Sequence, residues 1–495
     1  MKKTLSILMS VLIAMLMTVA LSANMFASAF ENGNGTSNDP YKIFNADDFM
    51  ELVEASEYDS FENEYFVLEN NISVSEGYIG NEDTPFMGNF NGNGKTVTFT
   101  NDDFTGMFRC VEDATVENLN VTGKLFVEDG SDEDGIGVAG IVGTAFGRTT
   151  IDNCTFKGSA TNQGVKKNYM AGICGYGSGN LTISGCINYA NLEGNGTYIA
   201  GILGYFTKGF VSVKNCMNYG EVLGNSFIAG IIGNVLDSGF SVNHCINAGK
   251  IDSYMYAGGI LNAKNTKDKT NEMSVMNCIN RGIVCSDDKN GRVAGIAGYI
   301  EDSVKDFSVI NCANFGKIQG TDRNGGILAS WSSQTGLKLI MKNCYNGGTI
   351  IGTTKDALIG YYVKNSADVI TTNFFDSTIC ATTLSNLGLA TAADTVEEAV
   401  AKLNESVNNS GWFEWSVGYV NAKGELVASQ ESGAVAQAVF TKDIPVSQGS
   451  GIGSVLSEGN LWVIIVVAVA AIAAVAVLVV VKKKKTVITA ADDND

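Results

Sequence analysis

The chain has 495 residues, among them 57 glycines but only 3 prolines, so its turns rest on glycine and asparagine. With 52 acidic and 33 basic residues its net charge is −19, which argues against nucleic acid as a partner. The single histidine, His244, excludes mechanisms that need two, among them zinc proteases with a His-Glu-x-x-His motif.

The N-terminal residues have the pattern of an export signal. Lys2 and Lys3 precede an apolar run over residues 5–21, and residues 27–29, Ala-Ser-Ala, offer small side chains at a cleavage site. Residues 1–29 are therefore predicted to be a secretory signal peptide, and the mature chain is expected outside the cytoplasm.

Residues 30–110 are predicted to form a cap followed by short strands. Asn45 is placed to cap a helix that runs to residue 55. Alternating strands are predicted at 65–68, 72–74 and 96–99. A related strand follows at 116–121, with Leu119 in the place that a cysteine takes later in the chain.

From about residue 137 to residue 362 one phrase occurs seven times with small variations: Ala-Gly-Ile-apolar-Gly, then Asn-Cys-x-Asn-x-Gly. Its isoleucines lie 29 to 36 residues apart, at Ile141, Ile173, Ile202, Ile231, Ile260, Ile296 and Ile327. Its cysteines are Cys154, Cys186, Cys216, Cys245, Cys278, Cys312 and Cys344. A fixed period of this length indicates a solenoid or a related repeat architecture.

Each unit contains three short β-prone pieces, which predicts an all-β, parallel β-helix with short helical caps over residues 30–380. The isoleucines and cysteines are expected to fill its core. The asparagine two residues after each cysteine is expected to bond along the stack. The glycine four residues after most of the cysteines is expected to supply a positive φ.

Eleven cysteines in an exported chain raise the question of disulfides. Neighbouring rungs lie at a suitable spacing, but parallel Cβ vectors hinder the torsion that a disulfide needs. We interpret the cysteine ladder as buried free thiols; a partly bridged ladder and metal binding are the alternatives.

The C-terminal part is predicted to close the solenoid and to anchor it. Residues 381–425 are interpreted as a cap, with a helix that begins at a capping box of Thr395 and Glu398. Residues 426–460 are interpreted as a linker. An uncharged run at 461–481 predicts a transmembrane helix, and the lysines that follow place the tail 482–495 in the cytoplasm.

Several strings resemble bacterial surface proteins with GLUG-motif repeats on a pectin-lyase-like β-helix, which implies that the parallel β-helix is right-handed. They are Pro40-Tyr41-Lys42-Ile43, Phe90 to Lys95 and the Gly-Ile-x-Gly repeats, together with Leu403-Asn404 before Trp412 and Trp415. The resemblance covers roughly residues 33–420. It implies display on the cell surface and adhesion, and no catalytic motif of the enzymatic relatives maps onto this chain.

Four residues are candidates for binding. The segments 261–274, 299–307 and 328–340 are longer than their counterparts in earlier units, and such insertions gather on one face of a solenoid. Trp331 is expected on an exposed loop there, where its ring would contact a ligand. Asp288, Asp322 and Arg323 lie in turns that are expected to stack, as polar binding residues or as a catalytic group.

No cofactor is expected. Acidic residues gather before the first full repeat, at Glu128, Asp129, Asp132, Glu133 and Asp134. Their composition is compatible with calcium, but their spacing matches no EF-hand loop, and we interpret them as a solvated loop.

The predicted function is that of a membrane-anchored surface protein, extracellular except for its tail, that acts as a non-catalytic adhesin or envelope interaction protein. Its partners are expected to be a glycan or a protein of a host or neighbouring cell. The alternatives are a polysaccharide lyase or glycoside hydrolase on the same β-helix, and a passive spacer.

Overall fold

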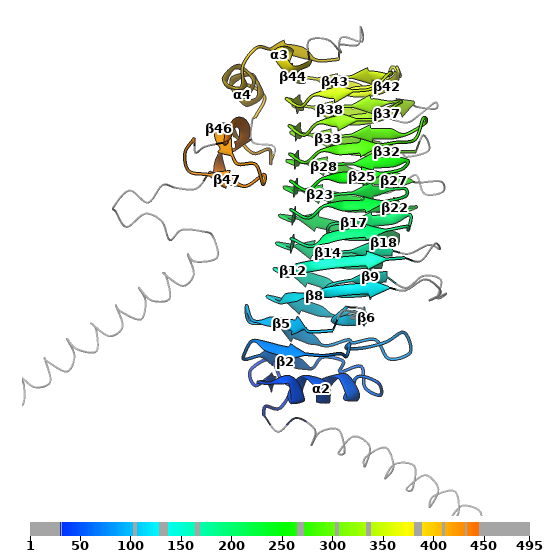
Figure 1. Cartoon of the computed structure of the whole chain (residues 1–495), viewed down its shortest axis with the longest axis vertical. Helices are drawn as coiled ribbons and strands as arrows, with labels where there is room; N and C mark the ends of the chain where they lie inside the picture. The colour runs from blue at the N-terminus through cyan, green and yellow to red at the C-terminus, as the bar shows by residue number, and fades with distance from the viewer. Residues whose placement is uncertain are drawn as a thin grey trace, which may run out of the picture. The chain divides into compact units, whose positions relative to one another are not determined.

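The computed structural model describes residues 30, 32–101, 106–127, 137–163, 169–264, 272–301, 306–332, 338–380, 389–407, 411–430 and 433–444. It confirms the predicted parallel β-helix (Figure 1). Within these residues three parallel sheets form the sides of the stacked coils, and we call them sheets I, II and III. The eight strands of sheet III correspond to eight three-sided coils.

Sheet I has nineteen strands within the described residues. They are β1 (Tyr41–Ile43), β2 (Tyr65–Leu68), β4 (Asn89–Asn91), β6 (Phe108–Glu112), β7 (Thr115–Glu117), β10 (Val142–Phe146), β11 (Thr150–Asp152), β14 (Cys174–Ser184), β18 (Leu203–Lys214), β22 (Ile232–Leu236), β23 (Gly239–Asn243), β27 (Leu261–Lys264), β28 (Met273–Met276), β32 (Ala297–Ile300), β33 (Phe307–Ile310), β37 (Leu328–Ser332), β38 (Leu339–Lys342), β42 (Ile359–Val363) and β43 (Val369–Thr371).

Sheet II has eighteen strands in the described part of the chain. They are β3 (Ile72–Val74), β5 (Thr96–Phe99), β8 (Asn120–Val127), β12 (Thr155–Asn162), β15 (Ile187–Asn188), β16 (Asn191–Gly194), β19 (Met217–Asn218), β20 (Val222–Gly224), β24 (Ile246–Asn247), β25 (Ile251–Ser253), β29 (Ile279–Asn280), β30 (Val284–Ser286), β34 (Ala313–Asn314), β35 (Ile318–Gln319), β39 (Tyr345–Asn346), β40 (Ile350–Ile351), β44 (Phe374–Asp376) and β45 (Thr391–Ala393).

Sheet III is narrow and consists of β9 (Gly137–Ala139), β13 (Tyr169–Ala171), β17 (Tyr198–Ala200), β21 (Ile228–Ala229), β26 (Tyr256–Gly258), β31 (Arg292–Ala294), β36 (Asn324–Gly325) and β41 (Lys355–Asp356). The Ala-Gly-Ile phrase connects each strand of sheet III to the next strand of sheet I. Gly172 and Ile173 therefore form a corner, with strands on either side of it.

The repeat residues fill the core as predicted. The motif isoleucines and cysteines are fully buried, and all eleven cysteines are free thiols. Leu119 takes the cysteine position in an earlier coil, since its carbonyl accepts from Thr155 as the Cys154 carbonyl accepts from Ile187. The same core position is therefore filled by leucine in this earlier coil and by cysteine in the later coils.

The asparagines two residues after the cysteines form the predicted ladder. In Asn188, Asn218, Asn247, Asn280 and Asn314 each Nδ2 donates to the Oδ1 of the asparagine in the next coil, at 2.7 to 2.8 Å. Each Nδ2 also donates to a backbone carbonyl two residues on, as Asn218 does to Gly220 at 2.9 Å. These buried amides therefore have partners on both sides, which buried polar groups require.

The glycines four residues after the cysteines serve another purpose than the predicted positive φ. None of Gly220, Gly249, Gly282, Gly316 and Gly348 has a positive φ. A Cβ atom on Gly249 would lie 1.9 Å from the Gly220 carbonyl oxygen, so close stacking of the coils requires glycine here. The left-handed residue is instead the one before the cysteine, for example Asn277 with φ of 53°.

Helices lie at both ends of the described chain (Figure 1). α2 (Ala46–Ala55) begins after Asn45, whose side chain accepts from the backbone of Asp47 and Asp48 as predicted. After the last coil come α3 (Ser377–Cys380) and α4 (Val396–Asn404). The expected N-cap is confirmed, since Thr395 Oγ1 accepts from the Glu398 N–H at 3.1 Å, while the Glu398 carboxylate accepts from the N–H of Asp394 at 2.7 Å.

Part of the expected linker, within residues 426–443, has secondary structure. β46 (Trp415–Val420), β47 (Leu426–Val427) and β48 (Val435–Phe440) form an antiparallel sheet, and the 3-10 helix η1 (Thr441–Asp443) follows. This C-terminal sheet packs with α4 against an apolar column of sheet II. The column comprises Ile246, Ile279, Ala313, Tyr345 and Phe374, and all of these except Phe374 directly follow a motif cysteine.

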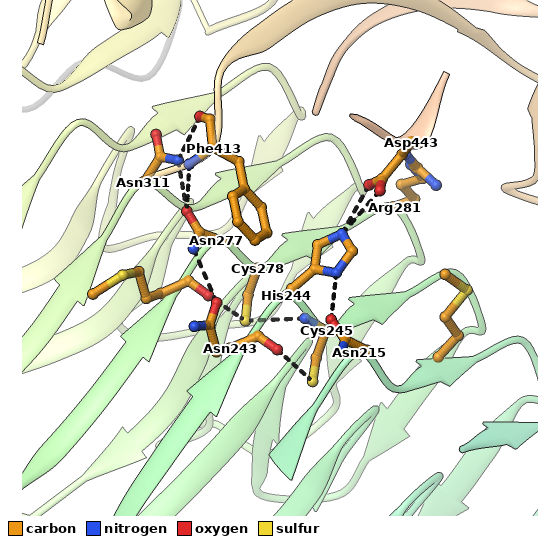
Figure 2. Close-up of polar contacts among 12 residues, drawn as sticks. Asn215, Asn243, His244, Cys245, Asn277, Cys278, Arg281, Asn311, Phe413 and Asp443 are labelled. Atoms are coloured by element: carbon orange, nitrogen blue, oxygen red, sulfur yellow. Dashed lines mark hydrogen bonds and ion pairs between the residues drawn. The ribbon is translucent and has the colours of Figure 1, made fainter. Parts of the chain in front are cut away.

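Polar contacts fix the C-terminal segment to the asparagines that precede the cysteines (Figure 2). Asn277 Oδ1 accepts from the Phe413 N–H at 3.1 Å, and Asn311 Nδ2 donates to the Phe413 carbonyl at 3.0 Å. Trp415 Nε1 donates to Asn311 Oδ1 at 2.6 Å. The only histidine, His244, lies 2.9 Å from a carboxylate oxygen of Asp443.

Among the described residues, no helix has the length and apolar character that crossing a bilayer requires. The expected signal peptide at 1–29 and the expected membrane span at 461–481 lie outside those residues. Both stay predictions.

Candidate functional site

The corner between sheets III and I places two columns of side chains face to face. The sequence Tyr-x-Ala-Gly-Ile-x-Gly-Tyr appears in full at residues 169–176, with Cys174 as the variable residue, and again at 198–205. The tyrosine before the Ala-Gly-Ile corner belongs to sheet III and the tyrosine after it to sheet I. The rings of Tyr198 and Tyr205 therefore meet across the corner, with centroids 4.8 Å apart.

The strand register extends both columns over successive coils. The sheet III column comprises Tyr169, Tyr198, Phe227, Tyr256, Arg292 and Arg323. The sheet I column comprises Tyr176, Tyr205, Asn234, Tyr299, Ser330 and Tyr361. It has no member in β27, where the register shifts, and it therefore ends one coil beyond the sheet III column. We call these two columns together the tyrosine stripe.

The rings of the stripe contact one another without interruption from coil to coil. Tyr169 stacks on Tyr205 with centroids 4.6 Å apart and an interplanar angle of 15°. Tyr198 contacts Phe227 at 5.3 Å, and Phe227 contacts Tyr256 at 4.9 Å. These separations are those of favourable aromatic pairs. Tyr169 and Tyr205 are buried, whereas Tyr198, Phe227 and Tyr256 keep part of their surface in solvent.

The phenols of Tyr176, Tyr198 and Tyr205 are neutral hydroxyl groups. Burial raises the pKa of Tyr176, Tyr198 and Tyr205, and for Tyr205 the neighbouring tyrosines raise the pKa further. Since the ordinary pKa is already near 10, these side chains keep their protons at any physiological pH. Each hydroxyl can therefore both donate and accept a hydrogen bond.

Two arginines continue the stripe in the later coils. The guanidinium carbon of Arg292 lies 4.7 Å from the centroid of the Tyr299 ring and 6.0 Å from that of Tyr256. The guanidinium carbon of Arg323 lies 4.8 Å from the Tyr361 ring centroid. These distances fall within the range of cation–π attraction, which holds the guanidinium groups against the rings.

A buried amide in the stripe lacks partners. Asn234 is 1% exposed, and neither its Nδ2 nor its Oδ1 atom has a hydrogen-bond partner among the described residues. It is the register partner of Tyr205, so its side chain lies on the same side of sheet I. A buried amide without partners costs about 1 to 3 kcal/mol. This cost would be recovered if a water molecule or a ligand hydroxyl bonded to Asn234.

Trp331 does not have the exposed position expected from the sequence. It lies in β37, is 2% exposed and packs 6.3 Å from the Phe307 ring, within the main core. The expectation of an exposed loop at this residue is therefore wrong. The residue belongs to the inner surface of sheet I, because it alternates with the outward Ser330.

The three polar candidates lie in turns between sheets II and III. Asp288 is half-buried, and its carboxylate accepts from the Asn290 N–H at 2.7 Å. Asp322 and Arg323 form an ion pair with a separation of 3.3 Å. Of the four predicted site residues, only Arg323 is part of the tyrosine stripe.

The longer segments of the late coils each connect two strands of sheet I, such as β27 and β28. Their central residues 265–271, 302–305 and 333–337 lie outside the described part of the chain, as does the acidic segment 128–136. Among the described residues, no three His, Cys, Asp or Glu side chains are grouped to hold a metal ion.

Most of the stripe was not predicted, although its signal is visible in the sequence repeats. The aromatic residues flank Ala-Gly-Ile in five units, with Arg292 and Arg323 in the same position as the first tyrosine. The prediction took from the spacing of the repeats only the residues that face inward. The outward positions of the same repeat carried the information on the candidate site.

Comparisons with known proteins identify no family. No family model matches the sequence, and no curated protein matches it. One crystal structure of similar fold is named as that of a putative immunoglobulin A1 protease from Bacteroides ovatus. It is 16% identical, covers 83% of this chain and 95% of its own, and has a TM-score of 0.36. A similarity at this level carries no argument about activity.

Proposed function

We propose that this chain is a non-catalytic binding protein of the cell surface and that it binds glycan chains along the tyrosine stripe. The observation that carries the proposal is the chain of ring contacts from Tyr169 to Tyr299 over successive coils, in which Tyr198, Phe227 and Tyr256 keep part of their surface in solvent. Aromatic rings offer apolar faces on which the CH faces of sugars can stack, and the phenols offer hydrogen bonds to sugar hydroxyls.

The chemistry of the stripe favours binding over cleavage. Glycoside hydrolysis generally requires two carboxyl groups on either side of the scissile bond. The two columns that define the stripe contain tyrosine, phenylalanine, asparagine, serine and arginine, without a carboxylate. The glycoside hydrolase alternative thus lacks its basic requirement in these two columns, and the spacer alternative does not account for the partly exposed rings.

Surface display is the second part of the proposal. It rests on the signal peptide pattern at 1–29 and the uncharged span at 461–481 with its lysine flank. The resemblance to GLUG-motif surface proteins supports the same location. In this arrangement the membrane anchor follows the C-terminal segment, and the β-helix lies outside the cell.

A glycan array tests the proposal. The full chain in detergent is applied as wild type and as the double variant Tyr198→Ala/Tyr256→Ala. The matched control is Tyr189→Ala/Tyr219→Ala, which removes a second pair of stacked tyrosines, 5.1 Å apart on sheet II and outside the stripe.

We expect the stripe variant to lose at least about tenfold in affinity for the bound glycans, and the control to retain wild-type binding. Bound glycans are recovered and show no new reducing or unsaturated ends. Equal binding by the two double variants, or no binding by the wild type, would rule out the stripe as a glycan site. Cleavage of the recovered glycans would favour the enzyme alternative.

A further inference from the structure

Positive charge is confined to one end of the tyrosine stripe. In the sheet III column, the early coils present Tyr169, Tyr198 and Phe227, and the later coils present Arg292 and Arg323. The sheet I column has no charged residue. The stripe is thus uncharged over its early coils and cationic over its late coils, in a chain whose net charge is −19.

The two arginines differ in their partners. Arg323 is already paired with the carboxylate of Asp322 at 3.3 Å. Arg292 has no carboxylate partner among the described residues, and its single polar contact there is a long one, from Nη1 to Ser330 Oγ at 3.4 Å. A guanidinium carries five N–H donors, so most donors of Arg292 remain available to a ligand.

The ring contacts hold this guanidinium in place. The Arg292 guanidinium lies over two rings that contact each other, those of Tyr256 and Tyr299, at 6.0 and 4.7 Å from their centroids. A planar guanidinium that is held in this way loses little further freedom when it binds a carboxylate, and the pair can form two parallel hydrogen bonds. The position therefore suits an acidic group of the ligand.

The same geometry disfavours a polyanion. Repeated negative charges would lie over the faces of the tyrosine rings, which are themselves electron-rich, and would be repelled by the negative field of the chain. A neutral glycan, in turn, would leave the donors of Arg292 unused. We propose that the ligand is an oligosaccharide with neutral sugars over the early coils and one carboxylate at Arg292. This inference rests on the proposed glycan binding.

A pair of matched probes tests this inference. The first probe is a linear oligomer of three N-acetyllactosamine units that ends in one sialic acid, and the second is the same oligomer after removal of the sialic acid. Polygalacturonate serves as the polyanion. Each is titrated into the full chain as wild type, as Arg292→Gln, and as the control Arg148→Gln, which removes an exposed arginine outside the stripe.

We expect the sialylated oligomer to bind at least about tenfold more tightly than its neutral counterpart, and Arg292→Gln to abolish this difference. The control keeps the difference, and polygalacturonate binds more weakly than the sialylated oligomer. Melting temperatures of the two variants are compared to confirm that both fold.

Three results would overturn the inference while leaving the proposed function intact. They are equal binding of both oligomers, a preference for the acid that survives Arg292→Gln, and strongest binding of polygalacturonate. Absence of binding by all three probes, together with an empty glycan array, would overturn both proposals. Absence of binding by the three probes with a positive array would reject the acidic oligosaccharide alone.

Discussion

Gly201 and Asn218 meet in the core of the β-helix. A Cβ atom on Gly201 would lie 2.3 Å from the Oδ1 atom of Asn218, in a space that no side chain can share. The same contact recurs in the pairs Gly172 and Asn188, Gly230 and Asn247, Gly259 and Asn280, Gly295 and Asn314, and Gly326 and Asn346. The two halves of the repeated phrase are thus linked: the corner glycine of the first half makes room for the asparagine ladder of the second.

This relationship predicts that Gly201→Ala is strongly destabilising. The new methyl group would also lie 2.4 Å from the Gly230 carbonyl oxygen, so neither neighbour can move without disturbing the ladder. We expect a loss of about 2 to 4 kcal/mol in the free energy of unfolding, measured by urea denaturation. A cost below about 1 kcal/mol would show that the coil adapts easily.

Gly94→Ala is the matched control. A methyl group on Gly94 would meet no atom within 4 Å, so the cost of this substitution comes from the φ of 70° alone. That backbone conformation costs an alanine about 1 to 2 kcal/mol. Gly201 has no positive φ, so a larger loss in Gly201→Ala than in this control reports the packing against the asparagine ladder and not backbone strain.

The inward-facing residues could be predicted well from the sequence. A ladder repeats one residue type at one position, so Cys245 and Asn247 identify their own environment by recurring with the period of the coil. The capping side chains of Asn45 and Thr395 were also predictable, because a cap depends on local spacing alone.

The remaining features depend on contacts between distant segments. The docking of Trp415 on Asn311 joins residues that are far apart in sequence and share no repeat. The burial of Trp331 could not be predicted, because its unit is longer than the earlier units. In such a unit the sequence does not show which strand residues alternate, so the inward position of Trp331 beside Ser330 cannot be recognised. The tyrosine stripe was not predicted, because the repeat period was interpreted only for residues that face the core. The aromatic residues that recur at outward positions of the same repeat were not interpreted.

The cysteine ladder predicts slow chemistry at the thiols of the native protein. Cys245 is fully buried, and its sulfur contacts the Val213 carbonyl at 3.6 Å. We expect thiol labelling to be slow in buffer and rapid in urea, and mass spectrometry to find no bridge between Cys216 and Cys245. Cys245→Asp should prevent stable folding because it buries a charge without a partner, whereas Cys245→Ala should cost only about 1 to 3 kcal/mol.

Alkaline pH should destabilise the fold because buried thiols resist losing their protons. Burial raises the pKa of Cys110 and of Cys344 from 9.0 to about 12. Below pH 9 the folded and unfolded chains both keep these protons, so stability is fully present. Between pH 9 and 12 only the unfolded chain releases them, so the free energy of unfolding falls as pH rises.

The measurement is urea denaturation at a series of pH values from about 7.5 to about 11, which spans the ordinary pKa of a thiol. Buried tyrosines titrate in the same range, so wild type is compared with Cys344→Ala. We expect the variant to lose less stability per pH unit above pH 9, by up to about 1.4 kcal/mol per unit for one proton. Identical slopes would mean that this thiol titrates in the folded chain as it does in the unfolded one.

The docked C-terminal segment predicts a local effect of Asn311→Gly. The substitution removes the acceptor of Trp415 Nε1 and the donor to the Phe413 carbonyl, and it suits the φ of 56° at this position. Asn153→Gly is the matched control, since Asn153 has a φ of 51° and bonds to Asn118 at 2.8 Å in an early coil that this segment does not contact.

Hydrogen–deuterium exchange of the full chain distinguishes the two variants. We expect Asn311→Gly to speed exchange in β46 and β48 by at least about tenfold, because local opening of the C-terminal sheet costs less when its polar contacts to the β-helix are lost. Exchange in the coils around Cys216 should stay as in the wild type. If Asn153→Gly speeds exchange in β46 equally, the contacts at Asn311 do not hold the segment, and the apolar column that begins at Ile246 is sufficient to do so.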